Sequence, residues 1–249
     1  MAQLRREDNE TIAYESRAGK SPGIMWLGGL KSDMTGTKAS ALDAIAAREG
    51  HAFLRFDYFG HGQSSGDFRN GTITRWRDDA LDVLDRLTQG PQILVGSSMG
   101  GWISLLLARA RPERIAGMLL IAPAADFTEA LMWARLPDDA KRQIMEEGEW
   151  LRPSDYDPDP YPITRALIED GRKNLILEDR IALSCPVRIL QGMQDPDVPW
   201  SHALKLVNAI DGDVMLTLVK NGDHRLSTDR DLRLIEETLT GLLAEVKTG

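Results

Sequence analysis

The stretch GSSMGG, residues 96–101, decides the fold of this chain. It follows a short apolar run, residues 92–95, and opens an apolar segment of helical length, residues 102–110. A strand, a tight turn and a helix in this order, with glycines two positions either side of a serine, are typical of a turn that holds the serine hydroxyl above a sheet edge. The pattern makes Ser98 the candidate nucleophile. Ser97 is the less central alternative, and a purely structural glycine-rich turn is the alternative without chemistry.

Around this turn, short apolar runs alternate with amphipathic segments of helical length. This alternation predicts an α/β fold, a mostly parallel sheet covered by helices on both faces. Residues 73–87 carry apolar side chains three and four apart, which predicts a helix with one buried face, and the pattern returns from about residue 228 to 246. The expected strands span residues 11–16, 23–27, 52–56, 92–95, 115–121, 187–191 and 214–219.

One segment breaks the alternation. Residues 125–182 contain short helical patterns and the run DPDPYP, residues 157–162, whose prolines can continue neither a helix nor a central strand. The length of 249 residues fits one large domain. We therefore expect a single domain over residues 1–249, with 125–182 as a helical lid inserted between two strands. Two core helices joined by a loop are the alternative.

The expected lid is rich in large apolar side chains, more than solvent-exposed helices would carry. Some of them should pack on the sheet, and those that face Ser98 should form the wall of an acyl pocket. The candidates are Phe127, Leu131, Met132, Trp133, Leu136, Ile144, Met145, Trp150, Tyr156, Tyr161 and Ile163.

The composition excludes several classes of protein. A net charge of -8 leaves no basic face for nucleic acid, and no apolar run approaches the ~18 residues of a membrane span. The single cysteine, Cys185, can form neither an internal disulfide nor a zinc cluster, and we expect it to be buried. Because the first residues carry acidic groups and no apolar stretch, the expected location is cytoplasmic. The oligomeric state stays open.

A serine hydroxyl is a weak nucleophile without a general base, and the chain offers four histidines. His224 directly follows the expected strand 214–219, and catalytic groups gather at the carboxyl ends of strands. The other three fit less well. His51 precedes a buried strand, His61 lies in a turn, and His202 begins a surface helix. We therefore expect His224 to be the base.

A carboxylate after a late strand should orient the histidine and stabilise its protonated form. The run GMQDPDVP, residues 192–199, offers Asp195 and Asp197. Asp195 is preferred because its spacing from the preceding glycine and the following VP pair matches the acid loop of the alpha/beta-hydrolase fold. The order Ser98, Asp195, His224 is also the order of that fold, and differs from the orders in chymotrypsin and subtilisin.

Acyl transfer also needs two N–H donors for the developing oxyanion. Met99, directly after the nucleophile, should supply one backbone donor. The loop GGLKS, residues 28–32, should supply the other, at Leu30, although many relatives of this fold have His-Gly where this chain has two glycines. We interpret DYFGHGQS, residues 57–64, as a structural turn that supports the nucleophile turn, with His61 non-catalytic.

These motifs together resemble the alpha/beta-hydrolase family over about residues 20 to 240. The matching segments are residues 32–38, 55–58, 90–102, 185–188, 195–200 and 223–225. The resemblance implies a hydrolase that cleaves carboxylic esters or thioesters through an acyl-enzyme on Ser98, with no metal and no cofactor. Within the family, the chain is most similar to mitochondrial members that act on palmitoylated proteins and acyl glucuronides. This implies a small ester or thioester, or an acylated protein, as substrate.

Other activities of the same fold stay open. Acyltransferase and cofactor-free haloperoxidase chemistry use the same triad, and some members are binding modules that have lost catalysis. Haloalkane dehalogenation is disfavoured because Ser98 stands where that reaction needs a carboxylate.

Overall fold

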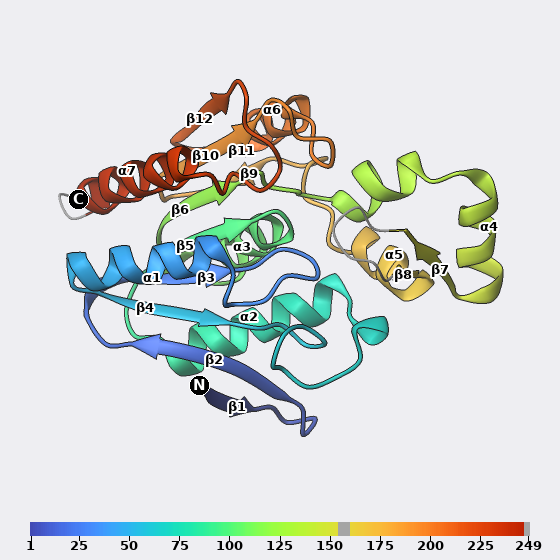
Figure 1. Ribbon diagram of the computed structural model, residues 1–249, viewed down its shortest axis with the longest axis horizontal. Helices are drawn as coiled ribbons and strands as arrows, with labels where there is room; N and C mark the ends of the chain where they lie inside the picture. Colours follow the sequence, from blue (N-terminus) through green and yellow to red (C-terminus); the bar gives the residue numbers. More distant parts are fainter. Residues whose placement is uncertain (154–159, 247–249) are drawn as a thin grey trace.

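One central sheet of eight strands organises the chain, which we describe from a computed structural model over residues 1–153 and 160–246. The strands run across the sheet in the order β1-β2-β4-β3-β5-β6-β10-β12 (Figure 1). Their bounds are β1 Ala2–Arg5, β2 Thr11–Arg17, β3 Lys20–Leu27, β4 His51–Phe56, β5 Gln92–Ser97, β6 Ile115–Ile121, β10 Val187–Gly192 and β12 Val214–Val219.

The sheet is mostly parallel. Every pairing from β4 through β3, β5, β6 and β10 to β12 is parallel, and β2 and β1 add on antiparallel at one edge. The central strand β5 is buried along its whole length, as suits a parallel strand covered on both faces. The predicted α/β class is confirmed, and all seven expected strands are present with ends shifted by at most three residues.

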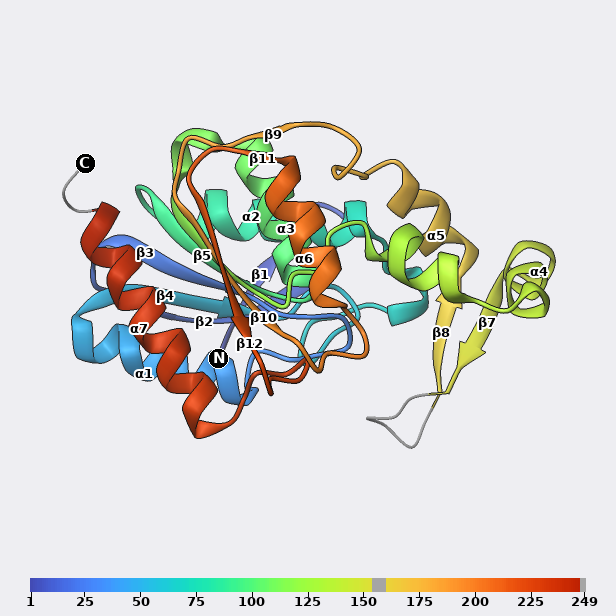
Figure 2. The ribbon, with the colours of Figure 1, turned by 90° about the horizontal axis from the view of Figure 1, so that it is seen from above.

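Helices cover both faces of the sheet (Figure 2). The buried residues of the two faces form two separate apolar cores. Helix α2 buries the expected stripe, which includes Trp76 and Leu84, and the Thr72 side chain caps its start by accepting from the Arg75 N–H. On one face lie α1 (Thr37–Glu49) and α7 (Asp229–Val246), and on the other α2 (Ile73–Leu87), α3 (Met99–Ala110) and α6 (Trp200–Ala209).

Strand β1 was not expected from the sequence. It buries only Leu4, so the alternation that marks a strand is too short to stand out. The strand exists because it pairs with β2 and because Arg6, directly after it, pairs with Asp79 and Asp82 on α2. Tertiary contacts rather than local pattern therefore create this element.

Residues 125–182 leave the sheet after β6 and return before β10, although these two strands are hydrogen-bonded neighbours. The described part of this segment stands beyond the carboxyl ends of the parallel strands in both views (Figures 1 and 2). Residues 154–159, with Tyr156 and the first half of the DPDPYP run, lie outside the described residues. The elements of this segment are α4 (Asp138–Glu147), the antiparallel pair β7 (Glu149–Arg152) and β8 (Tyr161–Thr164), and α5 (Arg165–Arg172).

Two features bear on the expectations drawn from composition. Within residues 1–153 and 160–246, no helix is both long enough and apolar enough to cross a membrane. Cys185 is only 7% exposed, and burial raises the pKa of its thiol to about 11. This cysteine is a buried core residue, as predicted.

Candidate active site

Ser98 occupies the turn between β5 and α3 with a strained backbone of positive φ, φ 53° and ψ -117°. The turn is fixed because the Ser98 N–H donates to the Ile121 carbonyl at 2.9 Å. Only glycine fits beside it, since a Cβ on Gly100 would lie 2.0 Å from the Leu27 carbonyl oxygen. Ser97, in contrast, is a buried residue of β5. The strain and the close backbone packing explain why this turn needs its glycines.

The structure brings Ser98, His224 and Asp195 together in one hydrogen-bonded chain. His224 Nε2 lies 3.1 Å from Ser98 Oγ, and His224 Nδ1 lies 2.7 Å from Asp195 Oδ2. An ionised carboxylate can only accept, so Nδ1 carries the proton and the Nε2 lone pair faces the serine hydroxyl. Ser98 follows β5, Asp195 follows β10 and His224 follows β12, three parallel strands whose carboxyl ends meet at one edge of the sheet.

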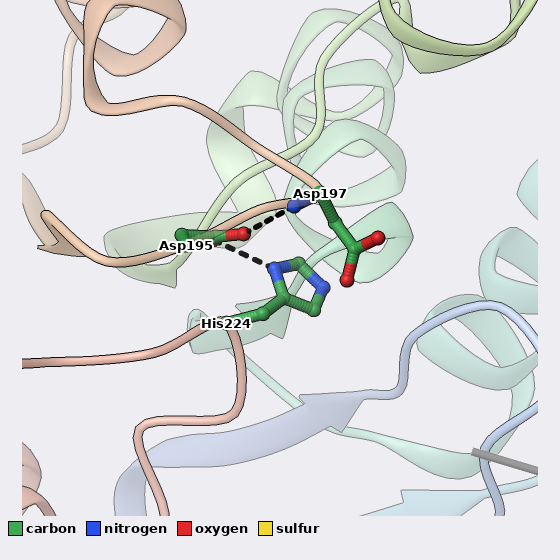
Figure 3. Close-up of side chains that lie close together, drawn as sticks. All are labelled: Asp195, Asp197 and His224. Carbon is green, nitrogen blue, oxygen red and sulfur yellow. Dashed lines mark hydrogen bonds and ion pairs between the residues drawn. The ribbon is translucent and has the colours of Figure 1, made fainter. Parts of the chain in front are cut away.

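Asp195 accepts hydrogen bonds from several donors. It is 8% exposed, and its Oδ1 accepts from the N–H groups of Asp197 at 2.9 Å and Val198 at 2.8 Å. Gln191 Nε2 donates to Oδ2 at 3.1 Å. Asp197 contributes its backbone to this arrangement, while its carboxylate points away from Asp195 (Figure 3). Asp195, the preferred of the two candidates, is thus the one bonded to His224.

Asp195, Asp197 and His224 also form a group with potential metal-ligand atoms within 4.8 Å of one another. In this group His224 Nδ1 and Asp195 Oδ2 are bonded to each other, and Asp195 Oδ1 accepts two backbone N–H groups. A metal would have to displace these bonds to gain its ligands. The arrangement fits an acid-histidine pair better than a metal site.

The remaining histidines make other contacts. His51 Nδ1 lies 2.7 Å from the Pro22 carbonyl, and His202 Nε2 lies 2.7 Å from the Ala125 carbonyl. His202 is 3% exposed, so although its helix lies at the surface, the side chain is buried. His61 is also buried and bonds to the loop after β3.

The two expected oxyanion donors both line the cavity that contains Ser98. Met99 is the first residue of α3, where backbone N–H groups have no intrahelical acceptor and the helix dipole favours negative charge. Leu30 lies in the loop that passes the nucleophile, since a Cβ on Gly29 would be 3.3 Å from Ser98 Cβ. Within the described residues neither the Leu30 nor the Met99 N–H has a hydrogen-bond partner.

The cavity has a volume of about 780 Å³ and opens over Ser98 and His224. Its wall comes partly from the 125–182 segment. Trp133, Ile144, Met145 and Ile163 do not line it, although they were candidates. The candidates that do line it are Phe127, Leu131, Met132, Leu136, Trp150 and Tyr161.

Sequence analysis missed several polar residues around this cavity. Lys38 on α1 donates to the carbonyl of Arg225, next to His224, and burial lowers the pKa of its ammonium to about 8. Arg135 donates to the carbonyls of Pro196 and Asp197 at 3.3 and 3.1 Å, joining the 125–182 segment to the acid loop. Both contacts join parts of the chain far apart in sequence, so no local pattern could reveal them.

The turn at residues 57–64 has a different partner from the one expected. Asp57 accepts from the N–H of Met34 at 2.7 Å, and His61 accepts from the N–H of Lys31 at 3.0 Å. Both donors belong to the loop after β3. The turn therefore supports the loop that contains Leu30, the expected second oxyanion donor, and among the described residues it makes no bond to the nucleophile turn.

Comparison with known proteins identifies close relatives. The sequence profile of the alpha/beta hydrolase family matches residues 22–237. The mouse protein named palmitoyl-protein thioesterase ABHD10, mitochondrial, is 40% identical over 98% of this chain and 83% of its own length.

Two solved structures are similar over nearly the whole chain. One is a hydrolase from Agrobacterium vitis S4, whose name states no substrate, with 47% identity, a TM-score of 0.92 and 97% of each chain covered. The other is mouse alpha/beta hydrolase domain-containing protein 10, with 39% identity, a TM-score of 0.91 and 98% of each chain covered.

These relatives overturn the expected cytoplasmic location. The mouse relative and four further mammalian relatives, at 38 or 39% identity, all carry the word mitochondrial in their names. The prediction was wrong because its basis was too weak. It rested on the acidic groups and the missing apolar stretch among the first residues, with a lone cysteine that fits any reducing compartment, and none of these features singles out the cytoplasm.

Proposed function

Because this chain belongs to the alpha/beta-hydrolase family, we propose that it is a serine hydrolase that cleaves carboxylic esters and thioesters through an acyl-enzyme on Ser98. The observation that carries the proposal is the hydrogen-bonded chain from Ser98 Oγ through His224 to Asp195. This geometry matches a nucleophile, its general base and the acid that orients the base.

The reaction would proceed in two steps. His224 Nε2 takes the hydroxyl proton as Ser98 Oγ attacks the substrate carbonyl, and the protonated imidazole then gives that proton to the leaving thiolate or alkoxide. Water, activated by the same histidine, hydrolyses the acyl-enzyme. Asp195 holds the Nδ1–H tautomer and stabilises the imidazolium that forms in each step. The N–H groups of Leu30 and Met99 would bind the oxyanion, where one donor typically contributes about 10² to 10³ in rate.

The acyl group would lie against the apolar wall of the cavity. Six large apolar or aromatic side chains of the 125–182 segment line it, including Leu131 and Leu136. Each buried CH₂ contributes about 0.8 kcal/mol, so this wall favours medium and long chains over acetyl. We assign the segment the role of a lid. Together with the names of the mammalian relatives, the wall supports a fatty acyl thioester, such as a palmitoylated protein, as the leading substrate.

A second candidate substrate, an acyl glucuronide, is favoured by the charge around the cavity. Two of its cations, Lys31 and Arg152, lie over the Tyr161 ring, with the Lys31 ammonium 5.6 Å and the Arg152 guanidinium 5.9 Å from its centroid. These cations would suit the carboxylate of the sugar. Among the described residues that line the cavity, five are cationic and two are carboxylates, 5 - 2 = +3, although the chain carries -8: Lys31, Lys38, Arg135, Arg152 and Arg225 against Asp33 and Asp197.

The test uses one acyl chain on three leaving groups: an N-acetylcysteamine thioester, a p-nitrophenyl ester and an acyl glucuronide. The proposal expects free acid as product and an acid-quenched adduct on Ser98 in peptide mass spectra. The ranking of kcat/KM decides between the leaving groups. Acyl transfer to an added alcohol in preference to water would indicate an acyltransferase. Absence of both turnover and adduct would indicate a binding module.

A further inference from the structure

His61 lies at the centre of a buried aromatic cluster, close to the catalytic centre but outside the proposed triad. The side chain is 4% exposed. Its ring packs edge-on against Tyr58, Phe68 and Trp76, with centroid distances of 5.9, 5.3 and 5.3 Å. These rings fix where the imidazole sits and which way it faces.

Both ring nitrogens of His61 are engaged, and their partners allow one tautomer only. Nδ1 lies 3.0 Å from the Phe59 carbonyl, which can only accept, so Nδ1 must carry the proton. Nε2 accepts from the backbone N–H of Lys31 at 3.0 Å. Burial also lowers the pKa of His61 to about 4, so at neutral pH the ring stays uncharged and Nε2 remains an acceptor.

The Lys31 N–H belongs to the central peptide of a β-turn over Gly29–Ser32. The Ser32 N–H closes this turn on the Gly29 carbonyl at 3.2 Å, and Lys31, its third residue, has φ +57°. A positive φ at the third position, without one at Leu30, identifies a type II turn, which normally has glycine at the third position. A flip of the central peptide would convert the turn to type I, which suits a lysine better. The hydrogen bond to His61 opposes that flip.

The same turn carries Leu30, the proposed second oxyanion donor, and it passes directly over the nucleophile. Gly29 approaches so closely that a Cβ there would lie 3.3 Å from Ser98 Cβ. A flip would break the bond to His61, and the preceding peptide, which carries the Leu30 N–H, would lose the anchor that holds it beside Ser98. The shape of this turn is therefore coupled to the geometry of the oxyanion site.

We propose that His61 is a positioning residue for the oxyanion site: its Nε2 holds the Gly29–Ser32 turn in the type II form that presents the Leu30 N–H. The proposal rests on the proposed serine-hydrolase function. It predicts that His61 stabilises the transition state more than it stabilises bound substrate, because the oxyanion forms only during the reaction.

The first test is His61→Phe, which keeps an aromatic ring but removes the acceptor. We expect kcat to fall by about 10- to 100-fold, a part of the loss seen when an oxyanion donor is deleted, with little change in KM. Phe68→Leu is the matched control, because it disturbs the same cluster and leaves the acceptor in place. If His61→Phe lowers Tm strongly, His61→Leu serves as the acceptor-free variant. A folded, acceptor-free variant with wild-type kcat would overturn the proposal.

A second readout separates positioning from a general loss of structure. A trifluoromethyl ketone forms an oxyanion on Ser98, whereas the matching methyl ether binds as an unreactive substrate analogue. In the acceptor-free variant, binding of the ketone should weaken by the same factor by which kcat/KM falls. The ether should bind as tightly as it binds to the wild-type protein. Equal weakening of both ligands would contradict the proposal.

The third readout is a double-mutant cycle with Lys31→Gly. Glycine accepts a positive φ without strain, so the turn should keep its type II form without help from His61. The fall in kcat caused by His61→Phe should therefore be severalfold smaller in the Lys31→Gly background. A fall of the same size in both backgrounds would overturn the mechanism. Ser98→Ala in the same assays separates the two proposals: if it retains turnover, the serine mechanism itself fails.

Discussion

At the scale of single residues, the two aspartates of the acid loop differ by the bond they make. Asp195 Oδ2 accepts from His224 at 2.7 Å, whereas Asp197 supplies only its backbone N–H to Asp195. Asp195→Asn should therefore lower kcat by about 10⁴, as in the protease precedent, because the amide favours the wrong histidine tautomer. Asp197→Asn, with the same change of charge, is the control and should have a small effect. Steady-state kinetics with Tm for both variants checks this, and the reverse order would move the acid role to Asp197.

A second prediction at this scale concerns metals. The potential ligand atoms of His224 and Asp195 are already used in bonds to each other and to backbone N–H groups. Activity should therefore survive prolonged dialysis against EDTA and 1,10-phenanthroline. Loss of activity that one divalent cation restores would show that the reaction needs a metal in addition to the triad.

Single residues also show what sequence can reveal. Ser98, Asp195 and His224 could be chosen because each follows a strand that the apolar pattern marks, and because their order in the chain is distinctive. The contact of His61 with Lys31 could not be chosen in this way. Those residues are 30 positions apart, and the bond depends on an aromatic cluster that forms only in the folded chain.

At the scale of elements, the 125–182 segment forms part of the wall of the proposed acyl site. Asp126, at its start, ties the segment's two ends together by accepting from the N–H groups of Ile176 and Leu177 at 2.8 to 3.1 Å. Arg135 then fixes it to the acid loop. The segment is thus attached at its base and beside the triad, which suits a wall for the acyl chain.

The wall predicts a dependence on chain length. With thioesters and p-nitrophenyl esters of two to sixteen carbons, below micelle formation, kcat/KM should rise about fourfold per added CH₂ until the cavity is full. Leu136→Ala should lower kcat/KM for long chains by about tenfold and leave acetyl substrates unchanged. Leu151→Ala is the control, because Leu151 lies in the same segment, is 45% exposed and does not line the cavity. If kcat/KM does not change with chain length, or is highest for acetyl, a fatty acyl chain is ruled out as the preferred substrate.

Elements were predictable to different degrees. The parallel strands are continuous apolar runs, so the pattern marks them clearly, and the stripe of α2 is equally clear. Strand β1 and the β7–β8 hairpin were missed because each buries few residues and depends on a partner strand. Where burial is slight, the sequence carries little periodic signal.

At the scale of the whole molecule, the parallel sheet assembles the proposed active site from distant parts of the chain. The serine and the histidine are 126 positions apart in sequence, yet both follow strands that end at the same edge. Helices on both faces bury the central strands, β5 above all, between two apolar cores, so the sheet acts as a rigid frame. Exchange of the Ser98 side chain at the end of β5 should therefore change the chemistry and leave the frame intact.

The most direct test of the account is Ser98→Ala, measured with an active-site fluorophosphonate, ester and thioester turnover, and Tm. The change removes one hydroxyl and creates no cavity, so Tm should stay at the wild-type value. Labelling and turnover should both be lost, while Ser97→Ala should retain both, because Ser97 is a strand residue without a bond to His224. A folded Ser98→Ala protein that still labels or still turns over would contradict the central claim.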